Sequence, residues 1–303
     1  MSTEDRQVYA TMDIKQKKAH LYNLLIQHPR FKKALTKIRH CHESKEISNE
    51  PLCMFVTGQS GCGKSKIFET YINKYSKTLY GQTGTKKNIL SAKIPSPVRI
   101  STFTEALLDK LGDPYPTSGK LGNKIHRLQK LIIKCEVELI MLDEFQHFVK
   151  TEKPKDMYHV ADNFKSLINE TGVSVVLFGL DEAEKIFSEN KQLGRRFTIK
   201  EVIFPFNYND QASINEFRAL LSQIDRKLPF VELAGLGTAE LADKIMIATN
   251  GVMNSIMKLI KDAALNALIQ DKEKIDMADL AMSYDLHSFF LSGLVEKKAN
   301  PFI

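Results

Sequence analysis

The pattern that most constrains this 303-residue chain is the glycine-rich octapeptide 58–65, which reads G-x-x-x-x-G-K-S. The apolar run 52–57 before it predicts a buried strand, and the apolar spacing after it predicts a helix over 64–80. Strand, glycine loop and helix in this order are the context of a phosphate-binding loop. Glycines let consecutive backbone N–H groups face the phosphates, and the helix N-terminus adds its positive dipole end. The chain is therefore predicted to bind a nucleoside triphosphate.

Two side chains of this loop have specific predicted roles. Lys64 would reach the β- and γ-phosphates, and the Ser65 hydroxyl would ligate Mg²⁺. The predicted nucleotide contacts in and beside the loop are Gly58, Gln59, Ser60, Gly61, Cys62, Gly63, Lys64, Ser65 and Lys66. The alternative is a strand–helix turn that binds nothing, and the flanking strand and helix make it the weaker interpretation.

A second apolar run, 137–142, predicts another buried strand, which ends in Asp143 and Glu144. Asp143 would help Ser65 to hold Mg²⁺, and Glu144 would act as general base toward the attacking water. Alone, this acidic pair could be a solvated strand end, but beside a phosphate loop it completes a hydrolytic site. The adjacent glutamate and the absence of a guanine-reading N-K-x-D sequence favour ATP, with Mg²⁺, over GTP.

The composition is that of an ordinary soluble globular protein. Hydrophobic residues make up 43% and charged residues 26% of the chain, and no apolar run approaches the length of a membrane span. The N-terminus lacks a secretory signal, so we expect a cytoplasmic protein without membrane contact. The four cysteines lack C-x-x-C spacing, which indicates a reducing compartment. The run 40–42, His-Cys-His, is interpreted as a solvated helix end rather than a metal site.

The net charge of +7 is concentrated between the two ATP motifs. Residues 77–134 contain eleven Lys and Arg against three acidic residues, so the rest of the chain is nearly neutral. For any single lysine, exposure to water is the simpler interpretation, but the concentration favours the DNA backbone as a partner. The predicted DNA contacts follow an expected strand at 98–101 or lie in or beside an expected loop at 112–120. They are Thr102, Thr104, Thr117, Ser118, Lys120 and Lys124.

Short apolar runs alternate with helical segments before the pattern turns all-helical. The expected strands are 52–57, 98–101, 137–142, 173–178 and 201–205. This rhythm predicts an α/β fold, a five-stranded parallel sheet flanked by helices, with a helical N-terminal extension and a small C-terminal helical lid. Exposed loops are expected at 81–97 and 112–120. The expected domains are an extension 1–50, a nucleotide-binding core 51–206, a lid 207–284 and a tail 285–303.

Further segments complete a family pattern around the two ATP motifs. They are 142–148 (LDEFQHF), 173–179 (VSVVLFG), 192–197 (QLGRRF), 249–253 (TNGVM) and 300–302 (NPF). Together these segments resemble the TniB/TnsC family of AAA+ transposition ATPases, nearly over the full chain from about Tyr22. The two ATP motifs are the parts that are specific by themselves.

The resemblance implies a protein that oligomerises on double-stranded DNA when ATP is bound, as a ring or a helical filament. It also implies recruitment of a transposase and a TniQ-like target-selection protein. In such assemblies an arginine from a neighbouring subunit completes the ATP site. Arg195 and Arg196 match that position, with Arg196 preferred because it directly precedes Phe197. The alternative role for both is capping the C-terminal end of their own helix.

Two positions depart from the usual AAA+ pattern. Leu180, followed by Asp181, stands where a polar sensor is common, and Asn254 stands where a sensor arginine is expected, with Lys258 the nearest cation. These departures predict slow hydrolysis, with ATP acting mainly as an assembly switch. The alternative function is a helicase-loader-like or remodelling AAA+ ATPase that acts on a protein partner. The terminal segment 286–303 is expected to dock against a neighbouring subunit or partner rather than fray.

Overall fold

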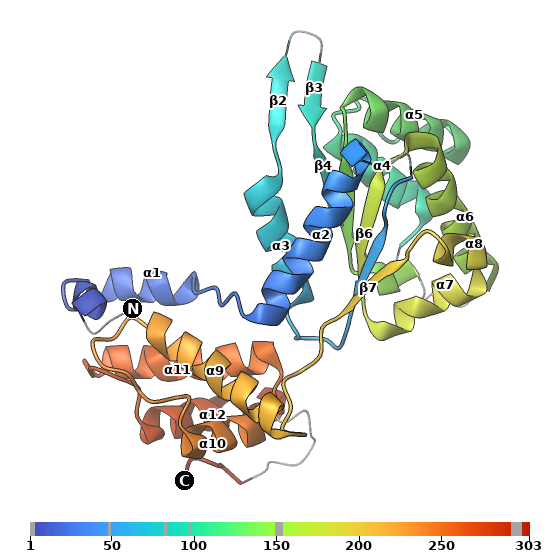
Figure 1. The fold of residues 1–303 in the computed structure, drawn as a ribbon. Coiled ribbons are helices and arrows are strands. Elements are labelled where there is room, and N and C mark those ends of the chain that lie inside the picture. Colours follow the sequence, from blue (N-terminus) through green and yellow to red (C-terminus); the bar gives the residue numbers. More distant parts are fainter. Residues whose placement is uncertain (1–3, 48–49, 82–83, 97, 149–153, 292–298) are drawn as a thin grey trace. The chain divides into compact units, whose positions relative to one another are not determined.

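The computed structural model describes residues 4–47, 50–81, 84–96, 98–148, 154–291 and 299–303 (Figure 1). The chain divides into two compact units, which we call the core unit (Pro29–Ile203) and the helical unit (Met1–His28 with Phe204–Ile303). The expected N-terminal extension 1–50 is thus shared between the two units, and the later boundary lies at 203/204 rather than 206. None of the described helices combines the length and apolarity that crossing a membrane requires.

The core unit is built on a five-stranded parallel sheet, as the sequence predicted. The strand order is β4-β5-β6-β1-β7. The strands are β1 (Met54–Thr57), β4 (Ile89–Lys93), β5 (Leu139–Asp143), β6 (Ser174–Phe178) and β7 (Ile199–Val202). All residues of β1, β5 and β6 are buried, because helices cover both faces of a parallel sheet. The carboxyl ends of these three central strands therefore meet at one edge of the sheet.

Helices flank the sheet on both sides. On one side α2 (Pro29–Ile47) and α3 (Lys64–Tyr75) pack on each other and on the central strands. On the other side α4 (Ile100–Lys110), α5 (Leu121–Lys134) and α6 (Pro154–Thr171) share a large apolar core with the sheet. Three short helices, the 3-10 helix η3 (Asp181–Glu184), α7 (Lys185–Glu189) and α8 (Lys191–Gly194), link β6 to β7.

Two of the sequence-based strand predictions are wrong in position. Residues 98–101 lead into α4, and the edge strand is instead β4, inside the expected loop 81–97. Ile89 and Leu90 are buried in the sheet. This apolar run is short, and because polar residues and prolines follow it, the sequence pattern predicted a loop there. The last strand begins at Ile199 rather than 201 because its register is set by pairing with β1.

The helix after the phosphate loop is shorter than expected. α3 ends at Tyr75, where Ser76 takes an extended backbone conformation. The next residues form β2 (Thr78–Gly81), which pairs antiparallel with β3 (Gly84–Lys87) in a separate two-stranded ribbon. This ribbon is fixed by cross-strand pairing, which helical spacing of apolar residues does not reveal.

The helical unit contains η1 (Glu4–Tyr9), α1 (Ile14–Tyr22), α9 (Gln211–Lys227), α10 (Ala239–Thr249), α11 (Met253–Ile269) and α12 (Met277–Leu291). The apolar residues of α11 follow helical spacing and are buried in the core of this unit. α1 ends at Tyr22, so Leu24 and Ile26 join that core from a non-helical segment. Arg6 is buried and donates hydrogen bonds to five carbonyl groups of residues 225–232. The N-terminal segment is therefore an integral part of this unit.

The chain end docks on its own unit, which differs from the expected docking on another molecule. Phe302 is buried, and its ring centroid lies 6.2 Å from that of Tyr284. The Asn300 side chain donates to the carbonyl of Ala281 at 3.0 Å. The middle of the predicted docking segment, 292–298, lies outside the described residues. Where it is described, the end of the chain is held by the helices that precede it.

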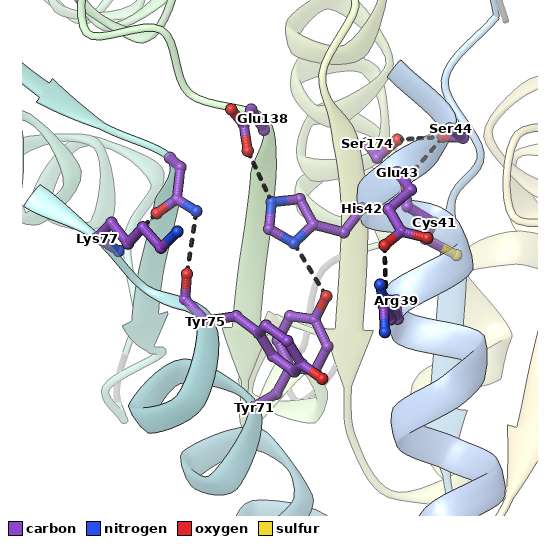
Figure 2. Close-up of polar contacts among 11 residues, drawn as sticks. Arg39, Cys41, His42, Glu43, Ser44, Tyr71, Tyr75, Lys77, Glu138 and Ser174 are labelled. Atoms are coloured by element: carbon purple, nitrogen blue, oxygen red, sulfur yellow. Dashed lines mark hydrogen bonds and ion pairs between the residues drawn. The ribbon is translucent and has the colours of Figure 1, made fainter. Parts of the chain in front are cut away.

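The predicted solvated helix end at 40–42 is wrong for Cys41 and His42, although His40 is exposed. Cys41 is fully buried, and the His42 ring is hydrogen bonded to the Tyr71 hydroxyl at 2.9 Å and to Glu138 at 3.0 Å (Figure 2). Among the described residues, no group of three or more His, Cys, Asp or Glu side chains is placed to hold a metal ion. This end of α2 is covered by α3 and by the start of β5, which spacing along one helix cannot show.

Candidate functional site

The loop between β1 and α3 has the backbone that its glycines permit. Gly58, Gly61 and Gly63 have positive φ angles of 142°, 80° and 105°. At Gly58 a Cβ atom would lie 2.2 Å from the carbonyl oxygen of Ile203, so no other residue fits without moving the backbone just after β7. Gly63 forms the N-cap of α3. These residues curve the chain around the helix N-terminus, which favours an anion there.

Lys64, the first residue of α3, is buried within this loop. Its ammonium donates to the carbonyl oxygens of Gly58 at 2.7 Å and Gln59 at 2.8 Å. Burial lowers the pKa of Lys64, and the charges of Asp143, Asp181 and Glu144 oppose that shift. The cation and the three carboxylates therefore belong to one electrostatic site, although they come from separate parts of the sequence.

Asp143, the last residue of β5, carries an unusual buried carboxylate. Its Oδ1 accepts from the backbone N–H of Glu144 at 2.9 Å, whereas its Oδ2 has no hydrogen-bond partner among the described residues. Burial raises the pKa of Asp143, and the neighbouring Ser65 side chain opposes the shift. A buried carboxylate oxygen without a partner is costly. Carboxylate and hydroxyl oxygens are ligands that Mg²⁺ accepts, so Asp143 and Ser65 fit this ion.

Glu144 is held in place by Gln146, a residue to which sequence reasoning gave no role of its own. Glu144 has a positive φ of 65°, and its carboxylate accepts a hydrogen bond from the Gln146 side-chain amide. Gln146 is 4% exposed, and its Oε1 accepts from the backbone N–H of Leu180 at 3.1 Å. It lies in the 3-10 helix η2 (Phe145–Phe148). The signal in the sequence that could have indicated a role for Gln146 was that it is an amide within the otherwise aromatic run 145–148.

Asp181 links the site to the end of β1. Its Oδ1 accepts a hydrogen bond from the Thr57 hydroxyl at 2.7 Å, and Thr57 directly precedes the phosphate loop. Leu180 contributes a backbone N–H to Gln146 instead of a polar side chain. Asp181 is thus the polar side chain that follows β6 at this site. A role as sensor stays a prediction.

Arg195 and Arg196 lie between α8 and β7. Arg195 is exposed and Arg196 is half-buried near Cys53, whose thiol pKa it helps to lower against the larger effect of burial. Neither guanidinium has a hydrogen bond or ion pair within the described part of the chain. Both residues cap α8 through their backbone N–H groups, which donate to the carbonyls of Lys191 and Leu193 at 3.1 and 2.9 Å, and their side chains add no hydrogen bond to the helix. Action of the guanidinium groups on a neighbouring subunit stays a prediction.

The predicted DNA contacts fall into two groups. Thr102 is exposed on α4, and Thr117, Ser118 and Lys120 are exposed in the loop before α5. Thr104 and Lys124 are buried, and their donors are already used. The Thr104 hydroxyl donates to the Ile100 carbonyl at 2.7 Å. The Lys124 ammonium donates to Glu105 at 2.6 Å. The structure therefore argues against Thr104 and Lys124 as phosphate contacts, because α4 and α5 enclose them.

The parallel sheet, the phosphate loop and the acidic end of β5 define a P-loop ATPase fold of the AAA+ class. The chain belongs to the TniB family, since the family model "Bacterial TniB protein" matches residues 19–204. A comparison with curated protein sequences found no match.

Solved structures support the fold at low sequence identity. The Aeropyrum pernix ORC2 protein in its ADPNP–ADP complexes has a TM-score of 0.64 at 12% identity, over 88% of this chain and 71% of that one. The Aeropyrum pernix ORC1 protein in complex with DNA has a TM-score of 0.60 at 13% identity, over 89% and 69%. The Walker-type ATPase PABY2304 of Pyrococcus abyssi has a TM-score of 0.57 at 10% identity, over 90% and 75%. At these identities the likeness concerns the fold alone.

Proposed function

We propose that this protein is an ATP-dependent, DNA-binding regulator of transposition. In this proposal it oligomerises on target DNA with ATP bound, recruits the transposase and a TniQ-like protein, and disassembles through slow ATP hydrolysis. The carrying observation is the buried, unpaired oxygen of Asp143 beside Glu144 and the Lys64 loop, in a chain of the TniB family. The similarity to one protein solved with ADPNP and another solved with DNA supports the choice of ligands.

Different residues of the site have different roles in ATP hydrolysis. Lys64 and the loop N–H groups bind the β- and γ-phosphates, so the ammonium leaves the two loop carbonyls that it now contacts. Glu144 accepts a proton from the water that attacks the γ-phosphorus, while the bond to the oxygen bridging the β- and γ-phosphates breaks and ADP leaves. When bound by Ser65 and Asp143, Mg²⁺ supplies positive charge that stabilises the phosphates.

Gln146 supports the proposal that hydrolysis is slow. Its amide donates to the Glu144 carboxylate, so one oxygen of the proposed base is already engaged before it meets the attacking water. The same amide accepts from Leu180 after β6, so its position depends on that strand end. A change at residues 179–184 would therefore reach the proposed base through Gln146.

Assembly would place DNA and a second subunit at separate surfaces. Arg195 and Arg196, unpaired among the described residues, would stabilise the phosphates bound by a neighbouring copy. Thr102, Thr117, Ser118 and Lys120 remain exposed and could donate to DNA phosphates. Such contacts carry little base information, so DNA binding should be largely independent of sequence and steeply weakened by salt.

The variant Glu144→Gln tests the proposal. We expect ATP hydrolysis to fall by about 10²–10⁴-fold, because a positioned general base contributes roughly that factor. ATP binding should persist, and ATP-dependent oligomers on duplex DNA, followed by electron microscopy and light scattering, should last longer than those of the wild type. Glu189→Gln, an exposed glutamate at the end of α7, is the control.

Two results would contradict the proposal in different ways. Unchanged hydrolysis in Glu144→Gln would remove Glu144 as the base. Absence of duplex-dependent oligomers in both the wild type and the variant would instead favour a remodelling ATPase that acts on a protein partner.

A further inference from the structure

The ribbon formed by β2 and β3 is a feature to which the proposed ATP site assigns no role. Its four cross-strand pairs run from Thr78 with Lys87 to Gly81 with Gly84. It does not join the five-stranded sheet. Figure 1 shows it projecting from the core unit beyond the end of α3. An isolated two-stranded ribbon is marginally stable by itself, so its base must be held by the rest of the unit.

The base of the ribbon is held by several hydrogen bonds. The Lys87 backbone N–H donates to the Cys135 carbonyl at 2.8 Å, and the Lys87 ammonium donates to the Lys110 carbonyl at 2.8 Å. The Asn88 side chain accepts from the Lys77 backbone at 2.7 Å and donates to the Tyr75 carbonyl at 3.0 Å. Figure 2 shows Lys77 and Tyr75 beside the His42 network at this base. The ribbon is therefore a positioned arm.

The arm presents large side chains to solvent. Tyr80 is 86% exposed and Leu79 is 64% exposed, and these neighbours on one strand point to opposite faces. Scattered apolar residues on a surface are ordinary, but two at one projecting element are consistent with a contact surface. Tyrosine suits such a surface because it offers a flat ring and a hydroxyl that bonds phosphates.

The positive charge of the arm favours a negatively charged partner. The arm and its base, 77–88, contain three lysines, Lys77, Lys86 and Lys87, and no acidic residue. Lys77 and Lys87 have no ion-pair partner among the described residues. Lys86 is paired with Glu136 at 2.6 Å, but both side chains are more than half exposed, so the pair exchanges readily with another anion. A surface that combines the unpaired Lys77, the exposed Lys86, threonines and an exposed tyrosine is complementary to a polyanion.

We propose that the β2–β3 ribbon is a second DNA-binding element that contacts the backbone of duplex DNA. The major groove is about 12 Å wide and admits a two-stranded ribbon. Lys77 and Lys86 bond phosphates on the groove walls, and Tyr80 packs on the sugar–phosphate backbone. This inference rests on the proposed function, because it takes DNA as the partner, but it places the contact on residues outside α4 and the 112–120 loop.

Two variants test the two kinds of contact in duplex binding with ATP across a salt series. Lys77→Gln/Lys86→Gln should reduce the log–log salt slope by about 0.9 for each lost phosphate contact, and affinity at 0.1 M salt by roughly tenfold per contact. Tyr80→Ala should weaken binding several-fold at every salt concentration and leave the slope unchanged. Lys200→Gln is the matched control, since Lys200 is an exposed lysine paired with Glu184 at 2.6 Å.

Each outcome bears on the ribbon. Wild-type affinity and slope in both variants would overturn the ribbon proposal while the proposed function stands. Absence of duplex binding by the wild type would overturn both. Weaker oligomerisation of the variants without DNA, with an unchanged salt slope, would make the ribbon a protein contact instead. ATP hydrolysis without DNA should match the wild type, which shows that the variants fold.

Discussion

The two edges of the central sheet carry polar clusters of opposite kinds. At the carboxyl edge, one oxygen of the buried Asp143 has no partner among the described residues, and Lys64 bonds only to the carbonyls of its own loop. At the amino edge, both ring nitrogens of His42 are bonded, one to Tyr71 and one to Glu138 (Figure 2). The first cluster leaves one buried oxygen without a hydrogen-bond partner, whereas in the second both nitrogens of the His42 ring are bonded, beside a cavity of about 450 Å³.

The difference separates a site with an unsatisfied buried oxygen from a network whose hydrogen bonds are satisfied. Leaving a buried polar atom unpaired costs free energy, so a fold retains one where a ligand can supply the missing bond. A closed network stabilises the elements that meet in it, here α2, α3 and the start of β5. By sequence alone, the His-Cys-His run was interpreted as a solvated helix end and the Asp-Glu pair could have been a solvated strand end. Only the partners of each side chain distinguish them.

The largest effect is expected from Lys64→Ala at the carboxyl edge. Loss of a charged donor to the phosphates should weaken ATP binding by about 100-fold or more, because such hydrogen bonds contribute roughly 1.5–3 kcal/mol each. Thermal unfolding should change little. Titration calorimetry with ATP measures the effect, and Lys74→Ala, an exposed lysine near the other end of α3, is the control. Equal affinity of the two variants for ATP would contradict the assignment of the ATP site to the carboxyl edge of the sheet.

A smaller effect at the same edge is expected from Gln146→Leu. The variant frees Glu144 from its hydrogen bond, so ATP hydrolysis without DNA should rise by about three- to tenfold, the equivalent of one ordinary hydrogen bond. The affinity for ATP should not change. Steady-state phosphate release measures the rate, and Gln129→Leu on α5 is the control. Slower hydrolysis would show that Gln146 aligns the base rather than restrains it.

The smallest effect is expected at the amino edge from Tyr71→Phe. Removing the hydroxyl leaves one His42 nitrogen without its partner, which should lower the free energy of unfolding by about 1 kcal/mol and the Tm by roughly 2–4 °C. ATP binding and hydrolysis should match the wild type. Tyr75→Phe removes a hydroxyl that has no hydrogen bond among the described residues, and it should leave the Tm unchanged. A change in the ATP affinity of Tyr71→Phe would show that the His42 network at the amino edge affects ATP binding at the carboxyl edge.

The glycine loop and the two central strands beside it were predictable because their signals are local. Residues 54–57 and 139–143 are apolar runs whose burial follows from composition, and the Gly58 conformation follows from the residue type. The apolar stripe of α11 was equally readable at helical spacing. In each case the relevant residues lie within one turn or one strand of each other.

The remaining features depend on partners that are distant along the chain. β4 is a strand because it pairs with β5, and Lys124 is withdrawn from solvent because Glu105 of α4 faces it. Gln146 gains its role from Glu144 and Leu180, which meet only when β5 and β6 lie side by side.

Sequence by itself determined that this chain forms a parallel sheet with a phosphate loop, because backbone conformation and apolar periodicity are local properties. Tertiary structure decided which polar side chains are free to act. A hydrogen bond or ion pair satisfies a group only through a partner brought within about 3 Å, and residues far apart in sequence reach that distance only by folding. The unpaired oxygen of Asp143 and the fully bonded ring of His42 were both settled in that way.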